Sequence, residues 1–152
     1  NAYDGHIYIF GNKADDPNLD LTPYERDMLE SAGGCVMVFQ LRGTMIFGAS
    51  RAISRKNSEI EGCMGLIVDM SKVNHLGVSS ALALEEAILD MKSAGRTVFL
   101  VGKDEQPMKR LRNMGVIDKL REEYILPNMT KALEKVLYGK QQAQDAKIEA
   151  KD

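Results

Sequence analysis

Between residues 65 and 101, the pattern of apolar positions predicts a strand, a helix and a second strand. Residues 65–70 form a short apolar run without polar alternation, which is typical of a strand buried on both faces. Apolar residues then recur at helical spacing from Ala81 to Met91, and a second apolar run follows at residues 97–101. Because a helix that links neighbouring parallel strands crosses over in the right-handed sense, this stretch is predicted to be a βαβ unit.

The chain before this unit is predicted to contain two strands and a helix that leads into the unit. Residues 6–10 are a short apolar run suited to an edge strand, and residues 35–41 form a stronger one. Residues 49–60 are expected to be a helix with a thin apolar face and a solvated side.

Another helix is predicted to begin at Thr22, between these two early strands. Thr22 is a suitable N-cap, Pro23 occupies the first helical position, and Glu25 completes a capping box. The helix should bury Met28 and Leu29 and end at the glycine pair that follows. This insertion is expected to be a surface excursion, with a docking surface for a partner or for the membrane domain as the alternative.

After the βαβ unit, the pattern predicts two more helices and a last strand. Residues 103–114 have a helical period that ends at Gly115, and residues 124–126 suit a short strand. A final helix is expected at residues 129–138, with Asn128 as its N-cap.

The residues around the predicted strand-to-helix corner resemble those of STAS domains. A buried strand ends in Asp69-Met-Ser, and Val73, two further residues and Leu-Gly-Val-Ser-Ser-Ala then lead into an Ala/Leu/Glu-rich helix. This order is similar to the signature of that family, which includes anti-sigma-factor antagonists and the cytoplasmic tails of SulP-type anion transporters. The similarity covers about residues 35–138 and is carried more by the order of elements than by one motif. Within the family it is most similar to the SulP branch, and the loop resembles cyanobacterial bicarbonate transporters of the BicA type. The resemblance implies an α/β fold in STAS topology, a small mixed sheet with helices mainly on one face.

Composition narrows the classes of function. A length of 152 residues with 44% hydrophobic residues suits one domain, and a net charge of −2 disfavours nucleic-acid binding. The two cysteines, Cys35 and Cys63, lack a metal-binding CxxC spacing and do not make a disulfide framework, which favours reduced thiols in a cytosolic compartment. No apolar run approaches the roughly 18 to 20 residues that span a bilayer, so this fragment itself is expected to be soluble.

The chain is expected to form one domain in three parts. Residues 1–34 would supply a strand, a loop and the helical insertion, residues 35–138 the STAS core, and residues 139–152 a flexible tail that is disordered or a marginal helix. The chain begins with Asn1 and not with Met, which is consistent with a piece of a longer protein.

By resemblance, the chain is expected to be the cytoplasmic domain of a SulP-type anion transporter, with sodium-dependent bicarbonate uptake as the favoured activity of the whole protein. At the cytoplasmic face of the plasma (inner) membrane, it would serve homodimerisation, folding, trafficking or regulation, without catalysis or a cofactor. Its expected partners are the transmembrane domain of the same chain, a second copy and a regulatory protein. One alternative is a free-standing phosphoswitch protein of the anti-sigma-factor-antagonist type. The other is a small α/β enzyme, which is disfavoured because the corner offers Ser and Gly where an enzyme would need titratable groups.

The corner holds a candidate phosphorylation or anion site at Gly77, Ser79 and Ser80. When the signature is aligned on Val73, Ser79 takes the position that is phosphorylated in anti-sigma-factor antagonists, while Gly77 replaces the expected Asp and Ser80 the following Gly. A phosphate at a helix N-terminus would meet unpaired backbone N–H groups and a favourable dipole. The structural alternative is that both serine hydroxyls cap the helix.

The resemblance also implies a weak nucleotide-binding rim, formed by Gly43, Thr44, Phe47, Gly48 and Leu76, where two helix N-termini would meet at one end of the sheet. Ordinary turns are the alternative. The stretch at residues 102–104, Gly-Lys-Asp, is not a Walker sequence.

Metal binding is not expected, because His6 and His75 do not stand at ligand spacing with Cys, Asp or Glu. Asp69, at the end of the central strand, is more typical of a hydrogen-bond acceptor that stabilises the loop than of a general base.

Overall fold

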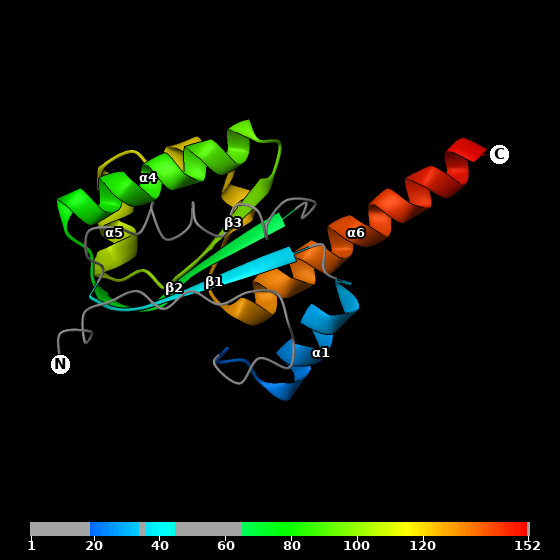
Figure 1. Ribbon diagram of the computed structural model, residues 1–152, viewed down its shortest axis with the longest axis horizontal. Coiled ribbons are helices and arrows are strands. Elements are labelled where there is room, and N and C mark those ends of the chain that lie inside the picture. Colours follow the sequence, from blue (N-terminus) through cyan, green and yellow to red (C-terminus); the bar gives the residue numbers. More distant parts are fainter. Residues whose placement is uncertain (1–18, 34–35, 45–64, 152) are drawn as a thin grey trace.

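The computed structural model describes residues 19–33, 36–44 and 65–151. Four strands form one sheet, and neighbouring strands are parallel (Figure 1). In order across the sheet they are β1 (Val36–Thr44), β2 (Gly65–His75), β3 (Thr97–Val101) and β4 (Ile125–Leu126).

Helices cover both faces of this sheet (Figure 1). The helices α4 (Val78–Ser93) and α5 (Gln106–Asn113) lie on one face, while α1 (Pro23–Ser31) and α6 (Met129–Lys151) lie on the other. Two short 3₁₀ turns, η1 (Ile117–Lys119) and η2 (Glu122–Tyr124), connect α5 to β4.

Each face buries its own apolar cluster, because side chains alternate along a strand. Met37, Phe39 and Leu66 pack with α4 and α5, whereas Val38 and Ile67 pack with α1 and α6. A parallel sheet is buried on both sides, which explains why the described helices are divided between two faces rather than placed mainly on one.

The expected α/β fold is confirmed, including the βαβ unit of β2, α4 and β3. The four described strands are all parallel. The expected strand at residues 6–10 and the expected helix at residues 49–60 lie outside the described residues.

The central strand is longer than expected, and the corner after it is shorter. β2 continues through His75 and α4 begins at Val78, so the expected loop from residue 71 to residue 80 shrinks to Leu76 and Gly77. The reason lies in the pairing of β1 with β2, where Gln40 pairs with Asp69 but Arg42 pairs with Lys72. One extra residue on β2 forms a bulge here, and a second register shift follows where Gly43 pairs with Val73 but Thr44 pairs with His75. With these irregularities the chain keeps strand geometry past the polar residues at which the apolar run ends.

A buried carboxylate stabilises this bulge. The Asp69 Oδ1 atom accepts hydrogen bonds from the backbone N–H and the hydroxyl of Ser71, at 2.9 and 2.6 Å. The Oδ2 atom accepts a hydrogen bond from Nε2 of Gln40, its partner across the strands, at 3.1 Å. Asp69 is 1% exposed, so these donors replace the water it loses on folding. Its predicted role as a structural acceptor is confirmed.

Gln40 extends the network to the segment before α1. Its Oε1 atom accepts a hydrogen bond from the Asp20 backbone N–H at 2.7 Å, and its Nε2 atom donates to the Asp20 carbonyl at 3.0 Å. The Asp20 side chain forms an ion pair with Lys72 at 3.0 Å. The network therefore joins the segment before α1 to both central strands.

The Lys72 ammonium lowers the pKa of Asp20 below its ordinary value of 3.8, first through its hydrogen bond and then through its charge. Partial burial raises this pKa, and the charges of Arg42 and Arg26 lower it further. Because the folded pKa is depressed, the ion pair stabilises the fold above about pH 3.8 and loses this effect as the pH falls through the lowered value. Both side chains are about half exposed, so water screens most of the attraction.

The predicted capping box of α1 is confirmed, and it reaches further than expected. The Thr22 hydroxyl accepts from the Glu25 N–H, and Glu25 Oε1 accepts from the Thr22 N–H. The second oxygen of Glu25 accepts a hydrogen bond from the Thr130 hydroxyl at 2.7 Å, which ties α1 to the start of α6. Asn128 caps α6 as expected, with Oδ1 2.9 Å from the Lys131 nitrogen.

The helix α6 extends well past the residue at which the sequence pattern ends. It runs to Lys151 and projects away from the sheet (Figure 1), with residues 145–150 exposed. The tail is therefore helical in the structure, and its flexibility stays a prediction. No helix in the described parts of the chain combines the length and apolar character needed to cross a membrane.

We expect Asp69→Ala to lower the free energy of unfolding by about 2 kcal/mol, because it leaves the Ser71 N–H without its buried acceptor and removes a partner of Gln40. Urea denaturation followed by circular dichroism measures the change. Asp90→Ala, at an exposed position of α4, is the matched control and should stay within about 0.5 kcal/mol of the wild type. Equal stability of the two variants would show that the network does not stabilise the fold.

Candidate functional site

The corner between β2 and α4 is held by a helix that is distant in sequence. Gln106, the first residue of α5, accepts a hydrogen bond from the Leu76 N–H at 2.8 Å and donates to the Leu76 carbonyl at 3.0 Å. Arg110 Nε donates to the same carbonyl at 3.3 Å, and the Leu76 side chain is fully buried. Both backbone polar groups of Leu76 are thus satisfied by α5, which fixes the direction in which α4 leaves the sheet.

The three residues of the candidate phosphorylation site lie at the start of α4, in a different arrangement from the expected one. Gly77 is the N-cap and provides no side-chain hydrogen bond, so neither Ser79 nor Ser80 occupies the N-cap position. Since α4 begins at Val78, both serines lie within its first turn. Ser79 is exposed, whereas Ser80 is buried, so only the Ser79 hydroxyl is accessible to a modifying enzyme. Phosphorylation of Ser79 stays a prediction.

The expected nucleotide rim is brought together only in part. Gly43 and Thr44 end β1 and pair with Val73 and His75 of β2, which places them at the same end of the sheet as the corner. Phe47 and Gly48 lie outside the described residues. Leu76 lies at this end too, but its side chain is buried and its polar groups are already bonded, so it offers no free group to a ligand.

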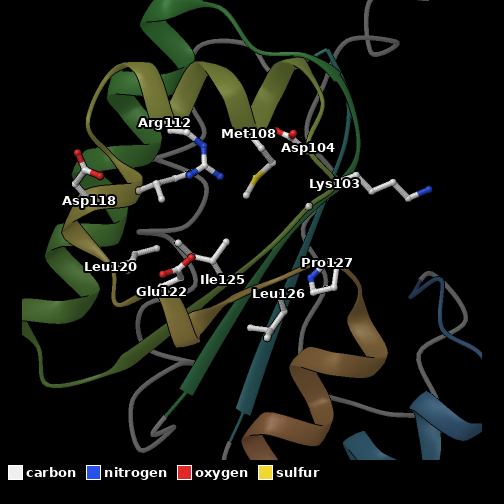
Figure 2. A pocket seen from close by; sticks show the side chains of 12 residues that line it. Lys103, Asp104, Met108, Arg112, Asp118, Leu120, Glu122, Ile125, Leu126 and Pro127 are labelled. Carbon is white, nitrogen blue, oxygen red and sulfur yellow. The ribbon is translucent and has the colours of Figure 1, made fainter.

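A second site, which the sequence did not predict, is an open pocket of about 620 Å³ at the carboxyl ends of β3 and β4 (Figure 2). It lies between α5 on one side and η1, η2 and β4 on the other. The carboxyl ends of parallel strands are where α/β sheets usually bind ligands. The charged residues that line it are Lys103, Asp104, Arg112, Asp118 and Glu122.

Gly102 leaves room for the Met108 side chain where the chain leaves β3 at this pocket. A Cβ atom on Gly102 would lie 2.7 Å from both Cγ and Sδ of Met108, which is closer than such atoms approach. The Gly102 N–H donates to the Leu126 carbonyl at 3.1 Å, so the same residue joins β3 to the end of β4. The glycine therefore lets Met108 pack against the turn and form part of the pocket wall. Because residues 102–104 lack a phosphate-loop pattern, only the position of Gly102 after a buried strand could have pointed to this site.

The chain matches the model of the STAS domain over residues 28–133, which is more than half of its length. It therefore belongs to the STAS domain family, as the residues around the corner predicted.

Within this family, the chain is similar to bicarbonate transporters. It is 39% identical over 120 residues to the bicarbonate transporter BicA of Synechocystis sp., and 35% identical over 124 residues to BicA of Picosynechococcus sp.. These alignments cover 79% and 82% of this chain, but only 21% and 22% of the relatives. The predicted resemblance to the SulP branch is confirmed, and the chain spans about a fifth of the length of these transporters.

Solved structures have the same fold. A sulfate transporter family protein from Wolinella succinogenes aligns with a TM-score of 0.61 at 21% identity, covering 82% of this chain and 97% of that one. The STAS domain of a SulP transporter from Vibrio cholerae aligns with a TM-score of 0.63 at 24% identity, covering 69% of this chain and 83% of that one.

The hydrogen bonds between Gln106 and the Leu76 backbone, here called the clamp on Leu76, can be tested by removing only the amide group of Gln106 that donates to the Leu76 carbonyl. Gln106→Glu keeps an acceptor for the Leu76 N–H but loses the amide that donates to the Leu76 carbonyl, whereas Gln106→Ala loses both. We expect a loss of stability of about 1 kcal/mol for the first and about 2 kcal/mol for the second. Hydrogen exchange should become faster at residues 76–80 in both variants. Unchanged exchange in Gln106→Ala would show that α5 does not hold the corner.

Proposed function

We propose that this chain is the cytoplasmic STAS domain of a SulP-type transporter that takes up bicarbonate together with sodium. The observation that carries the proposal is the 39% identity to BicA over 79% of the chain. The match to the family model extends through the central βαβ unit and the corner that follows β2, so it includes the order of elements that carries the resemblance.

In this proposal, the domain does not carry the anion. The chain covers only 21% of BicA, and the anion pathway would lie in the remaining part of the transporter. The domain would instead support homodimerisation, folding and trafficking, or regulation of transport, and it would catalyse no reaction. Its first partner would be the transmembrane domain of the same polypeptide.

The surface of α4 supports a role in contacts with other protein segments. Val78, Leu82 and Leu89 are large apolar residues that are between 36% and 52% exposed. Their spacing of four and seven residues places them on one side of the helix. A helix that only covered a sheet would gain nothing from such residues on its outer side, whereas a helix that contacts a partner would bury them.

The second candidate function is a free-standing phosphoswitch, in which an anti-sigma kinase modifies Ser79. The exposed position of Ser79 in the first turn of α4 favours it, because a phosphate there would lie near the positive end of the helix dipole. The glycine at residue 77, where that branch carries Asp, speaks against it. A phosphate mass increment after incubation with a cognate kinase that is absent in Ser79→Ala would decide in its favour.

An exchange of domains tests the transporter proposal. We expect a chimera of Synechocystis BicA, with its STAS domain replaced by this chain, to take up labelled bicarbonate in the presence of sodium. The same transporter without any STAS domain should lose most of its uptake or its level in the membrane. Immunoblots of the membrane fraction separate the two effects. A chimera that reaches the membrane at the normal level but transports no bicarbonate would contradict the proposed equivalence.

Homodimerisation is tested with the chain by itself. Sedimentation velocity over a range of concentrations should show a dimer that dissociates on dilution, because the interface within one domain is smaller than that of the complete transporter. A single monomeric species at the highest concentration would mean that the domain does not dimerise by itself.

A further inference from the structure

The pocket at the ends of β3 and β4 contains charged groups of both signs that have no side-chain partner among the described residues. In the described parts of the chain, the side chains of Arg112 and Glu122 form neither a hydrogen bond nor an ion pair. Figure 2 shows the Arg112 guanidinium extending from α5 toward the middle of the pocket, with the Glu122 carboxylate on the wall across from it. Lys103 extends away from the middle, at the rim. A bound molecule could therefore meet one cationic and one anionic group at the same time.

Part of the pocket wall is apolar. Ile125 and Leu126 are half-buried and Pro127 is exposed, and all three line the pocket. A molecule bound there would cover the part of their apolar surface that now faces water. The site thus favours a ligand with an aliphatic or similarly apolar body.

The balance of charge restricts the class of ligand further. Three carboxylates and two cationic groups line the pocket, so it is slightly acidic as a whole. A polyanion such as a nucleoside triphosphate would be repelled, and a simple anion bound at Arg112 would face Glu122. A simple cation bound at Glu122 would face Arg112 in the same way. A ligand that carries both charges satisfies both groups.

We propose that this pocket binds a small amphipathic zwitterion of about the size of a dipeptide or tripeptide. Its anionic group would bind Arg112, its cationic group would bind Glu122, and its apolar body would cover Ile125 and Leu126. The volume of about 620 Å³ is within the range of about 300 to 1,000 Å³ that is usual for small-molecule sites. The proposal rests on the pocket alone and does not depend on the transporter assignment.

Nuclear magnetic resonance with three related probes tests this proposal. The ¹⁵N-labelled chain is titrated with the dipeptide Leu-Leu, with N-acetyl-Leu-Leu, which lacks the cationic group, and with Leu-Leu amide, which lacks the anionic group. We expect Leu-Leu to shift the amide signals of residues 102–104 and 117–126 in a saturable way. The two blocked probes should bind about threefold more weakly or worse, because each leaves one charged side chain at the pocket without its partner in the ligand.

Single substitutions test which side chain binds each charged group of the ligand. Arg112→Gln should weaken Leu-Leu binding about threefold, while Lys109→Gln, at an exposed position of the same helix that does not line the pocket, should leave it unchanged. Glu122→Gln should abolish the preference for Leu-Leu over N-acetyl-Leu-Leu. Circular dichroism confirms that each variant is folded.

Two results would overturn the proposal. The first is the absence of saturable shifts at the pocket amides with millimolar Leu-Leu. The second is equal binding of Leu-Leu and N-acetyl-Leu-Leu by the wild-type chain, which would indicate a plain anion site at Arg112 in place of a zwitterion site.

Discussion

The buried hydrogen bonds of Asp69 are the interaction on which the central part of this fold depends. A carboxylate that is 1% exposed would be costly without donors, and here it receives hydrogen bonds from Gln40 and from two groups of Ser71. These bonds stabilise the bulge that lets β2 continue to His75. They also extend through Gln40 to the segment that begins α1, so one polar network sets both the exit of the central strand and the position of a helix on the sheet.

Because the bulge lets β2 continue to His75, the corner at Leu76 and Gly77 comes within hydrogen-bonding reach of α5. Gln106 and Arg110 then satisfy the polar groups of Leu76 and fix the start of α4. The same helix carries Met108 and Arg112 into the pocket at the next strands. The family-specific corner and the pocket are thus built on opposite sides of one short helix, and a ligand that moved α5 would act on the corner as well.

This arrangement suits a domain that works through contacts. A parallel sheet covered on both faces provides a stable body, and the exposed features lie on its outer helices. Val78, Leu82 and Leu89 lie on the outer side of α4, and α6 extends far beyond the sheet (Figure 1). Under the proposed function, these are the surfaces that would meet the rest of the transporter polypeptide, a second copy or a regulator.

The amino-acid sequence by itself determined the local elements whose signals are short in range. The apolar run at residues 97–101 became β3 with the same bounds, the capping box at Thr22 and Glu25 formed, and the order of elements around Asp69 identified the family. Only the tertiary structure decided where β2 ends, which residues hold Leu76, and that Arg112 and Glu122 share a pocket. The physical reason is that the bulge in β2 depends on how β2 pairs with β1. The hydrogen bonds that hold Leu76 likewise come from Gln106, 30 positions away in the sequence. A pocket depends likewise on how helix, turn and strand pack together, and no period or motif within one segment contains that information.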